Sequence, residues 1–209
     1  MKTLKYQPPE MRALEITRMK QEVREAIANG KRIIYTDEAM FTTATMLDRS
    51  YAGRHQNVTL EDKLASSPAL AVLAGVSQEK GLEAHLMQAR SIDSEAFNQY
   101  LLSLISGSKP SDFAILADNC RVHHSKVVAK FARENGIQII FMVAYGPEFN
   151  PIERFWSKVK LAFKKQRMQA ILEGASPDFE KLLRRILLGY STEKIASICQ
   201  RTYESMLAI

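Results

Sequence analysis

The sequence predicts an α/β fold in which a mixed, five-stranded sheet is flanked by helices on both faces, with extra helices at the C-terminus. Short apolar runs typical of buried strands recur along the chain. Two of these runs, residues 69–76 and 82–89, flank a turn at 78–81 and predict an antiparallel hairpin. Later strands at 113–118 and 137–143 alternate with helical patterns, which favours parallel pairing.

Composition agrees with a globular protein but says little about a partner. The chain has 209 residues, of which 46% are hydrophobic and 25% charged, enough for one good-sized domain. Its net charge of +6 favours a polyanionic partner only weakly. Two cysteines, Cys120 and Cys199, give neither a disulfide framework nor a zinc signature and suit a reducing compartment. With no apolar run of 18 residues, no membrane partner is expected.

The first expected helix covers about residues 10–29 and ends at Asn29-Gly30. A strand follows at 31–41. Because side chains alternate along a strand, Asp37 and Glu38 should lie on opposite faces and should not share a metal ion. We expect Glu38 to face a neighbouring helix or the edge of the sheet.

Residues 42–68 are harder to interpret. A short strand at 45–51 is one interpretation. The region is polar and basic, and a solvated loop is favoured over DNA contact. Its basic residues are Arg49, Arg54, His55 and Lys63.

Two more helices are expected between the later strands. One starts near Ser91–Ser94 and carries an apolar face. The other covers 126–135, with Ser125 as its N-cap.

The stretch 145–156 reads as a loop that ends in a helix start. Asn150 is a good N-cap, and Pro151 suits the first helical position. The helix should continue to about Gly174, with Glu153 in its first turn, where a carboxylate favours the helix dipole. From Arg154 to Leu172 there are six basic residues and no acid, which indicates either a solvated face or contact with a DNA backbone. They are Arg154, Lys158, Lys160, Lys164, Lys165 and Arg167.

Two amphipathic helices are expected at 176–190 and 192–208, opened by Pro177 and capped by Thr192. They should cover the sheet or form a partner surface. The predicted organisation is an N-terminal helical segment, a central α/β domain and a C-terminal helical extension, at residues 1–30, 31–174 and 175–209.

Three acids stand out from this pattern. Asp37 and Asp118 each close a short apolar run that belongs to a strand, and Glu153 lies in the first turn of a helix. Acids at the ends of buried strands are costly unless they are paired, hydrogen-bonded or metal-bound. If the three converge, bound divalent cations would relieve their repulsion, as in a two-metal phosphoryl-transfer site.

The acids lie in three blocks that resemble the catalytic domain of Tc1/mariner DDE transposases. The blocks are Tyr35-Thr36-Asp37-Glu38-Ala39-Met40-Phe41, Asp118-Asn119-Cys120-Arg121-Val122-His123 and Asn150-Pro151-Ile152-Glu153-Arg154-Phe155-Trp156. They occur in the family's order and cover about residues 30–170. Thirty-four residues separate Asp118 from Glu153, a spacing typical of the Tc1-like branch.

The resemblance implies a ribonuclease H-like fold, with Asp37 and Asp118 on adjacent strands and Glu153 reaching in from its helix. It implies two Mg²⁺ or Mn²⁺ ions bound by these three acids, which would be the catalytic residues. Supporting roles are expected for Asn119, His123 and Asn150. Asn119 either orients Asp118, contacts a phosphate or shapes the turn, and His123 is either catalytic or a structural hydrogen-bonding residue.

The implied function is cleavage of transposon-end phosphodiesters and transfer of the 3′-OH to target DNA. The partners would be double-stranded DNA and a second copy in a homodimer, in a nucleus or a bacterial nucleoid. The family's helix-turn-helix modules are not found, so we expect a fragment or a separate end-recognition element. Two alternatives stay open: a silent or repurposed DNA-binding protein, and a ribonuclease H-like nuclease.

Overall fold

The structure, a computed structural model, describes residues 8–42, 69–144, 146–175 and 177–208. The strand expected at 45–51 and the basic residues expected around it lie outside the described residues. No helix within the described ranges is long and apolar enough to cross a membrane.

The core of the fold is a mixed, five-stranded sheet in the order β3-β2-β1-β4-β5, which confirms the predicted fold class. β1 pairs antiparallel with β2 and parallel with β4, so it lies at the centre of the sheet. β2 and β3 form the predicted hairpin, and β4 pairs parallel with β5. The strands are β1 (Arg32–Phe41), β2 (Leu70–Ser77), β3 (Gly81–Ala89), β4 (Phe113–Ala117) and β5 (Gln138–Phe141).

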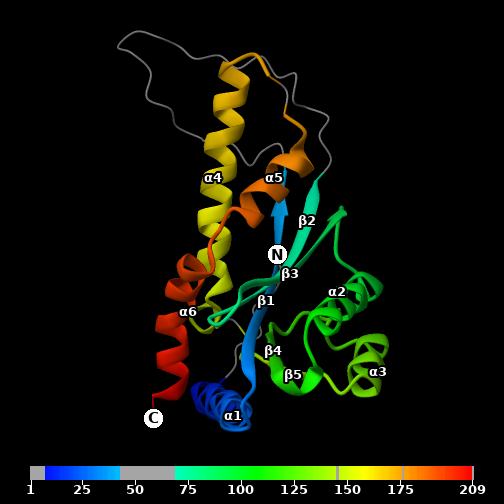
Figure 1. Ribbon diagram of the computed structural model, residues 1–209. Helices are drawn as coiled ribbons and strands as arrows, with labels where there is room; N and C mark the ends of the chain where they lie inside the picture. Colours follow the sequence, from blue (N-terminus) through cyan, green and yellow to red (C-terminus); the bar gives the residue numbers. More distant parts are fainter. Residues whose placement is uncertain (1–7, 43–68, 145, 176, 209) are drawn as a thin grey trace.

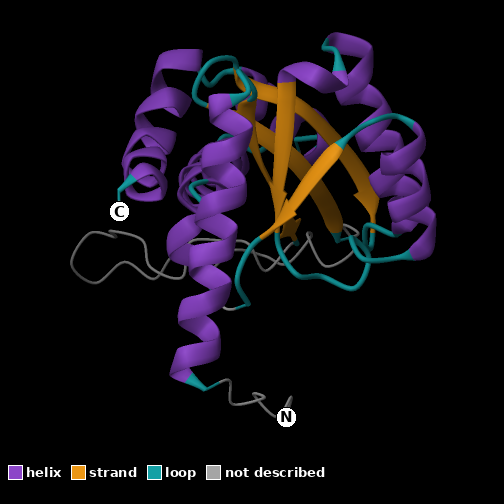
Figure 2. Cartoon of the chain, turned by 90° about the horizontal axis from the view of Figure 1, so that it is seen from below, coloured by secondary structure: helices purple, strands orange, loops and turns teal. Residues whose placement is uncertain are grey.

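Helices cover both faces of the sheet (Figures 1 and 2). Alternation along β1 decides which helices each residue meets: Ile33 and Tyr35 belong to one buried cluster, and Ile34 belongs to the other. The first cluster includes side chains of α1 (Pro9–Ala28), α4 (Ile152–Leu172), α5 (Phe179–Leu188) and α6 (Thr192–Leu207). The second includes side chains of α2 (Ser94–Gly107) and α3 (Lys126–Glu134).

Several element ends differ from prediction. β5 is shorter than the expected strand and only partly buried, because it is the edge of the sheet. α5 begins at Phe179 rather than near Pro177, since the Asp178 side chain accepts a 2.9 Å hydrogen bond from the Lys181 amide. Thr192 is the first residue of α6, whose N-cap position is taken by Ser191. The expected cap of α3 is confirmed, because the Ser125 side chain accepts a hydrogen bond from the Val128 amide.

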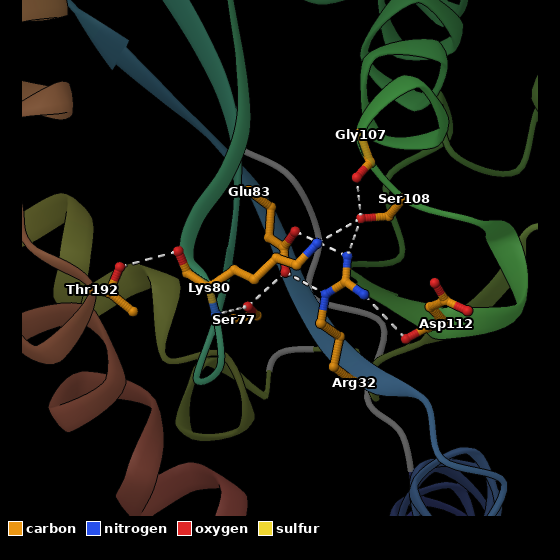
Figure 3. Close-up of polar contacts among 8 residues, drawn as sticks. All are labelled: Arg32, Ser77, Lys80, Glu83, Gly107, Ser108, Asp112 and Thr192. Atoms are coloured by element: carbon orange, nitrogen blue, oxygen red, sulfur yellow. Dashed lines mark hydrogen bonds and ion pairs between the residues drawn. The ribbon is translucent and has the colours of Figure 1, made fainter.

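A buried ion pair holds the start of β1 (Figure 3). Arg32 Nε and Nη2 lie 2.6 and 3.1 Å from the two carboxylate oxygens of Glu83 on β3, and the two side chains are only 10% and 5% exposed. Arg32 also donates to Ser108 Oγ after α2, and Ser77 Oγ donates to Glu83. A bidentate pair of guanidinium and carboxylate is well suited to burial when its remaining donors and acceptors are also hydrogen-bonded.

Gly75 allows a helix to approach the middle of β1. It lies opposite Thr36 in the β1–β2 ladder. A Cβ atom at this position would collide with the hydroxyl of Tyr100 on α2. The space is used by a buried 2.9 Å hydrogen bond between Thr36 Oγ1 and Tyr100 Oη. This contact fixes the strand one residue before Asp37.

Candidate active site

Strand pairing brings the first two acids together. β1 and β4 are parallel, with Tyr35 opposite Leu116. Two residues further along each strand, the same register places Asp37 beside Asp118, which directly follows β4. Neighbouring strands lie about 4.8 Å apart, so the two carboxylates start from adjacent backbone positions.

The third acid comes from α4. Glu153 is exposed in the first turn of this helix, which packs against β1. It lines the same cleft as Asp37 and Asp118. This cleft has a volume of about 490 Å³. The remaining lining residues are Asn119, Cys120, Met142, Val143, Ala144, Gly146, Pro147 and Asn150. The structure therefore gathers the three acids from β1, the end of β4 and the start of α4.

The cleft makes ionisation of Asp37 costly. Burial is the main cause that raises the pKa of this carboxyl to about 7, and the nearby charge of Glu153 adds to it. The charge of Asp118 raises the pKa further, while a hydrogen bond from the Glu38 backbone lowers it. Such a carboxylate would be stabilised by a cation placed among the three acids.

Asp118 is held by His123. The imidazole Nδ1 lies 2.9 Å from Asp118 Oδ1, and Nε2 lies 3.2 Å from Glu38 Oε1. The hydrogen bond from His123 is the main cause that lowers the pKa of Asp118. Burial opposes protonation of His123, but hydrogen bonds to Asp118 and Glu38 outweigh it and raise the pKa of the imidazole to about 10. His123 is therefore a buried, charged link between the two carboxylates, packed 4.4 Å from the ring of Phe97.

This link is a role for Glu38 that the sequence did not reveal. Alternation correctly placed its side chain on the opposite face from Asp37. On that face it meets His123, which follows β4 rather than belonging to a neighbouring helix. The sequence showed only that Glu38 is an acid next to Asp37, which does not indicate a contact with His123.

The side chain of Asn119 makes its hydrogen bonds to other parts of the protein. Its amide nitrogen donates to the Met142 carbonyl, and its Oδ1 lies 2.9 Å from His124 Nε2. His124 in turn stacks on Phe141, with ring centroids 3.9 Å apart. These contacts join the turn after β4 to the end of β5, which favours the interpretation that Asn119 shapes the turn at the edge of the cleft.

Asn150 differs from its predicted capping role. Residues Pro147–Phe149 form a short 3-10 helix, and α4 begins at Ile152 with no side-chain cap. The Asn150 side chain is instead buried in the wall of the cleft. Its Oδ1 atom has no hydrogen-bond partner among the described residues. A buried amide oxygen without a partner is costly unless a ligand or water satisfies it.

The donor set suits a hard divalent cation. Three carboxylates and the residue Asn150 line one cleft, and oxygen ligands are those preferred by Mg²⁺ and Mn²⁺. Within the described ranges, no group of three His, Cys, Asp or Glu side chains already lies close enough together to hold an ion. The oxygen donors of the cleft match the preference of such an ion, although the acids in this arrangement are too far apart to hold one together and His123 engages one oxygen of Asp118.

The six basic residues predicted on α4 do not share one surface. Arg154, Lys158 and Lys165 are exposed, and Lys160 and Lys164 are partly buried. Arg167 corrects the prediction of DNA contact. It is only 2% exposed, with its guanidinium 5.3 Å from the centre of the Phe179 ring at the start of α5, so it is covered by protein.

Comparisons with known proteins agree with this site. A family profile described as "DDE superfamily endonuclease" matches residues 32–173, which include all three acids. No protein with curated annotation matches the sequence. Among solved structures, the chain is similar to "Mos1 transposase paired-end complex with left transposon end", with a TM-score of 0.69 and 13% identity over 99% of this chain. The match covers 63% of that chain.

The chain is also similar to "Crystal structure of the catalytic domain of Mos1 mariner transposase". The TM-score is 0.58 and the identity 13%, and the match covers 97% of this chain and 94% of that chain. At such low identity these likenesses show the fold, a ribonuclease H-like sheet with its helices. The family profile covers most of the chain and every acid of the cleft, so the chain belongs to the DDE superfamily endonuclease family.

Proposed function

We propose that the chain is the catalytic domain of a Tc1/mariner-type transposase. It would cleave phosphodiester bonds at transposon ends in double-stranded DNA and transfer the resulting 3′-OH to target DNA. The observation that carries this proposal is the parallel β1–β4 register, which places Asp118 beside Asp37 in the cleft that Glu153 also lines. Similar structures include Mos1 complexes described with a transposon end and as a "Strand Transfer Complex".

Asp37, Asp118 and Glu153 would hold Mg²⁺ or Mn²⁺, with Asn150 Oδ1 as a further oxygen donor. Mos1 catalytic domain structures described with Mn and with Mg support this choice of ions. When bound, such ions lower the pKa of an attacking water or hydroxyl and stabilise the leaving oxygen of an in-line displacement.

The remaining residues would position these acids. His123 holds one oxygen of Asp118, and Glu38 holds the far side of the imidazole. Thr36 and Tyr100 fix the strand that carries Asp37. In cleavage, water adds across a P–O bond and frees a 3′-OH. In transfer, that hydroxyl forms a new P–O bond while another breaks, so no covalent bond to the protein is required.

The partners proposed from the family resemblance are a second copy of the chain and a separate module or protein that recognises transposon ends. The chain spans 63% of the length of the Mos1 chain in its transposon-end complex. Recognition of a particular end sequence, and a location in a nucleus or a nucleoid, are therefore proposed for the whole assembly.

Metal-dependent nicking of duplex DNA tests the proposal. We expect nicking with Mn²⁺ or Mg²⁺, none with a chelator, and loss of nicking in Asp118→Asn and Glu153→Gln. Glu173→Gln is a matched control, because Glu173 directly follows the other end of α4 and is exposed.

The competing functions give different outcomes. A DNA-binding protein without catalysis would bind duplex DNA and nick none of it, with or without metal. A ribonuclease H-like nuclease would prefer an RNA–DNA hybrid or a junction over plain duplex. Nicking that survives Asp118→Asn would contradict the proposed site.

A further inference from the structure

A hollow on the surface lies beside the acid cleft, between α4 and α6. It has a volume of about 780 Å³ and is lined by five cations and one acid. The cations are Arg154, Lys158 and Lys165 of α4 with Lys194 and Arg201 of α6, and the acid is Glu193. We call this hollow the basic groove. We propose that it binds the sugar–phosphate backbone of DNA, which makes α6 part of the nucleic-acid site.

Helical spacing places the cations along facing sides of the two helices. Arg154, Lys158 and Lys165 are separated by four and seven residues, and Lys194 and Arg201 by seven. Both spacings return to nearly the same side of an α-helix. With a rise of about 1.5 Å per residue, the α4 row extends about 16 Å, the axial length of roughly five nucleotides of duplex.

The cations are available to a ligand. All five are exposed, and none of their side chains makes a hydrogen bond or ion pair with another described residue. Some exposed basic residues elsewhere are paired: Arg184 pairs with Glu180 at 2.9 Å, and Arg18 pairs with Glu22 at 2.7 Å. The basic groove thus concentrates positive charge that the fold itself does not neutralise.

The groove and the cleft begin at neighbouring residues. Glu153 lines the acid cleft, and Arg154 lines the basic groove. In Figure 1, the lower end of α4 lies beside α6, and α4 begins at Ile152, next to these two residues. A backbone held in the groove would therefore pass close to the cleft.

DNA fits this surface better than an acidic polypeptide. The cations form a row of one sign, and backbone phosphates repeat at regular intervals along a strand. The floor between the rows is apolar, formed by Leu161, Ala162 and Ile198, over which long basic side chains can lie with their heads outward. This inference rests on the proposed function for the choice of DNA, but its test does not require catalysis.

The test is the salt dependence of binding to a fluorescent duplex of random sequence, measured by anisotropy with a chelator present. In Lys194→Gln/Arg201→Gln we expect binding weaker by about tenfold or more. A plot of log affinity against log salt should become shallower by about 1.8, since each lost phosphate contact reduces the slope by about 0.9. Arg154→Gln/Lys158→Gln, from the opposite wall, should give the same change.

The matched control is Lys126→Gln/Arg133→Gln, which removes one exposed lysine and one exposed arginine from α3 on the other face of the sheet. It should leave the slope unchanged. Urea unfolding should show equal stability for all variants, because the substituted side chains are exposed. If one groove variant fails to fold, the variant of the opposite wall decides the outcome.

Equal slopes in the groove variants and the α3 control would overturn the inference. Binding of poly-glutamate that is lost in the groove variants, with DNA binding intact, would overturn it in favour of an acidic protein partner. The nicking assay, with Asp118→Asn as the variant expected to lose nicking, separates this inference from the proposed function. Metal-dependent nicking with unaltered slopes refutes the groove alone, whereas altered slopes without any nicking refute the catalytic proposal alone.

Discussion

Buried charge is treated in opposite ways at the start and in the middle of β1. At its start, Arg32 meets the Glu83 carboxylate with both forks aligned, and serines complete the network. Five residues later, Asp37 lies in a cleft with Glu153 and Asp118, where like charges and burial raise its pKa to about 7. Paired charge stabilises the strand, whereas unpaired charge of one sign leaves a site that is completed by a ligand.

The largest effect on the unfolding free energy should come from breaking the ion pair between Arg32 and Glu83 at the start of β1. Arg32→Ala leaves the Glu83 carboxylate buried without its partner, which costs about 3–5 kcal/mol of unfolding free energy. Urea denaturation measures this loss. Arg133→Ala, at an exposed position on α3, should change the unfolding free energy by less than about 0.5 kcal/mol. The double variant Arg32→Met/Glu83→Leu should recover most of the loss, and a failure to recover would show that the serine contacts matter more than the charges.

Divalent cations that bind in the acid cleft should stabilise the folded protein. Mn²⁺ at about a hundred times its dissociation constant should raise the unfolding free energy of the wild-type chain by about 2.7 kcal/mol. Asp118→Asn should lose this stabilisation, because one of the three acids is gone. Asp112→Asn, an exposed aspartate before β4, should retain it. Equal stabilisation of both variants would place the bound ions outside the cleft.

Asp37→Asn should stabilise the metal-free protein at high pH. A carboxyl whose pKa is raised on folding contributes stability below its unfolded pKa, about 3.9, and loses that contribution as pH rises through about 7. Above pH 7 the variant should therefore be more stable than wild type by on the order of 2 kcal/mol, allowing for solvent screening. The difference should shrink as pH falls from 7 towards 4. Urea midpoints measured with a chelator at several pH values check this, and a constant difference would contradict it.

The smallest effect should come from Glu38→Gln. Glu38 contacts His123, which holds Asp118, so the change should weaken Mn²⁺ affinity by about tenfold, as for partners that orient metal ligands. Its effect on metal-free stability should stay below about 1 kcal/mol, because the Glu38 side chain is 27% exposed. Glu79→Gln, in the β2–β3 turn, is the control for loss of an acid. Unchanged Mn²⁺ affinity in Glu38→Gln would show that His123 holds Asp118 without help.

The sequence predicted the acids well because their placement follows from backbone geometry. The family resemblance implied adjacent strands for Asp37 and Asp118, and the parallel β1–β4 register brings the two residues together. Asn150 was predicted less well, since a cap depends on backbone angles that a 3-10 turn at 147–149 has altered. Arg167 was misplaced because the sign of a charge does not reveal which side of a helix a later helix covers.

The same limit hid part of the basic groove. Lys194 and Arg201 belong to a helix whose sequence shows an ordinary amphipathic pattern. Only the packing of α6 beside α4 turns their exposed side into a wall of a hollow. Likewise, the bond between Glu38 and His123 joins residues 85 positions apart, which no local pattern reports.

Helix α4 determines the angle around its axis between the acid cleft and the basic groove. Consecutive residues of an α-helix differ by about 100° around its axis, so Glu153 and Arg154 address different surfaces from one rigid rod. One residue inserted after Glu153 would rotate the following cations by about 100° and move them by about 1.5 Å, while Glu153 keeps its place. The orientation of a DNA strand at the cleft would then be a property of helical pitch, with no dependence on the bases of that strand.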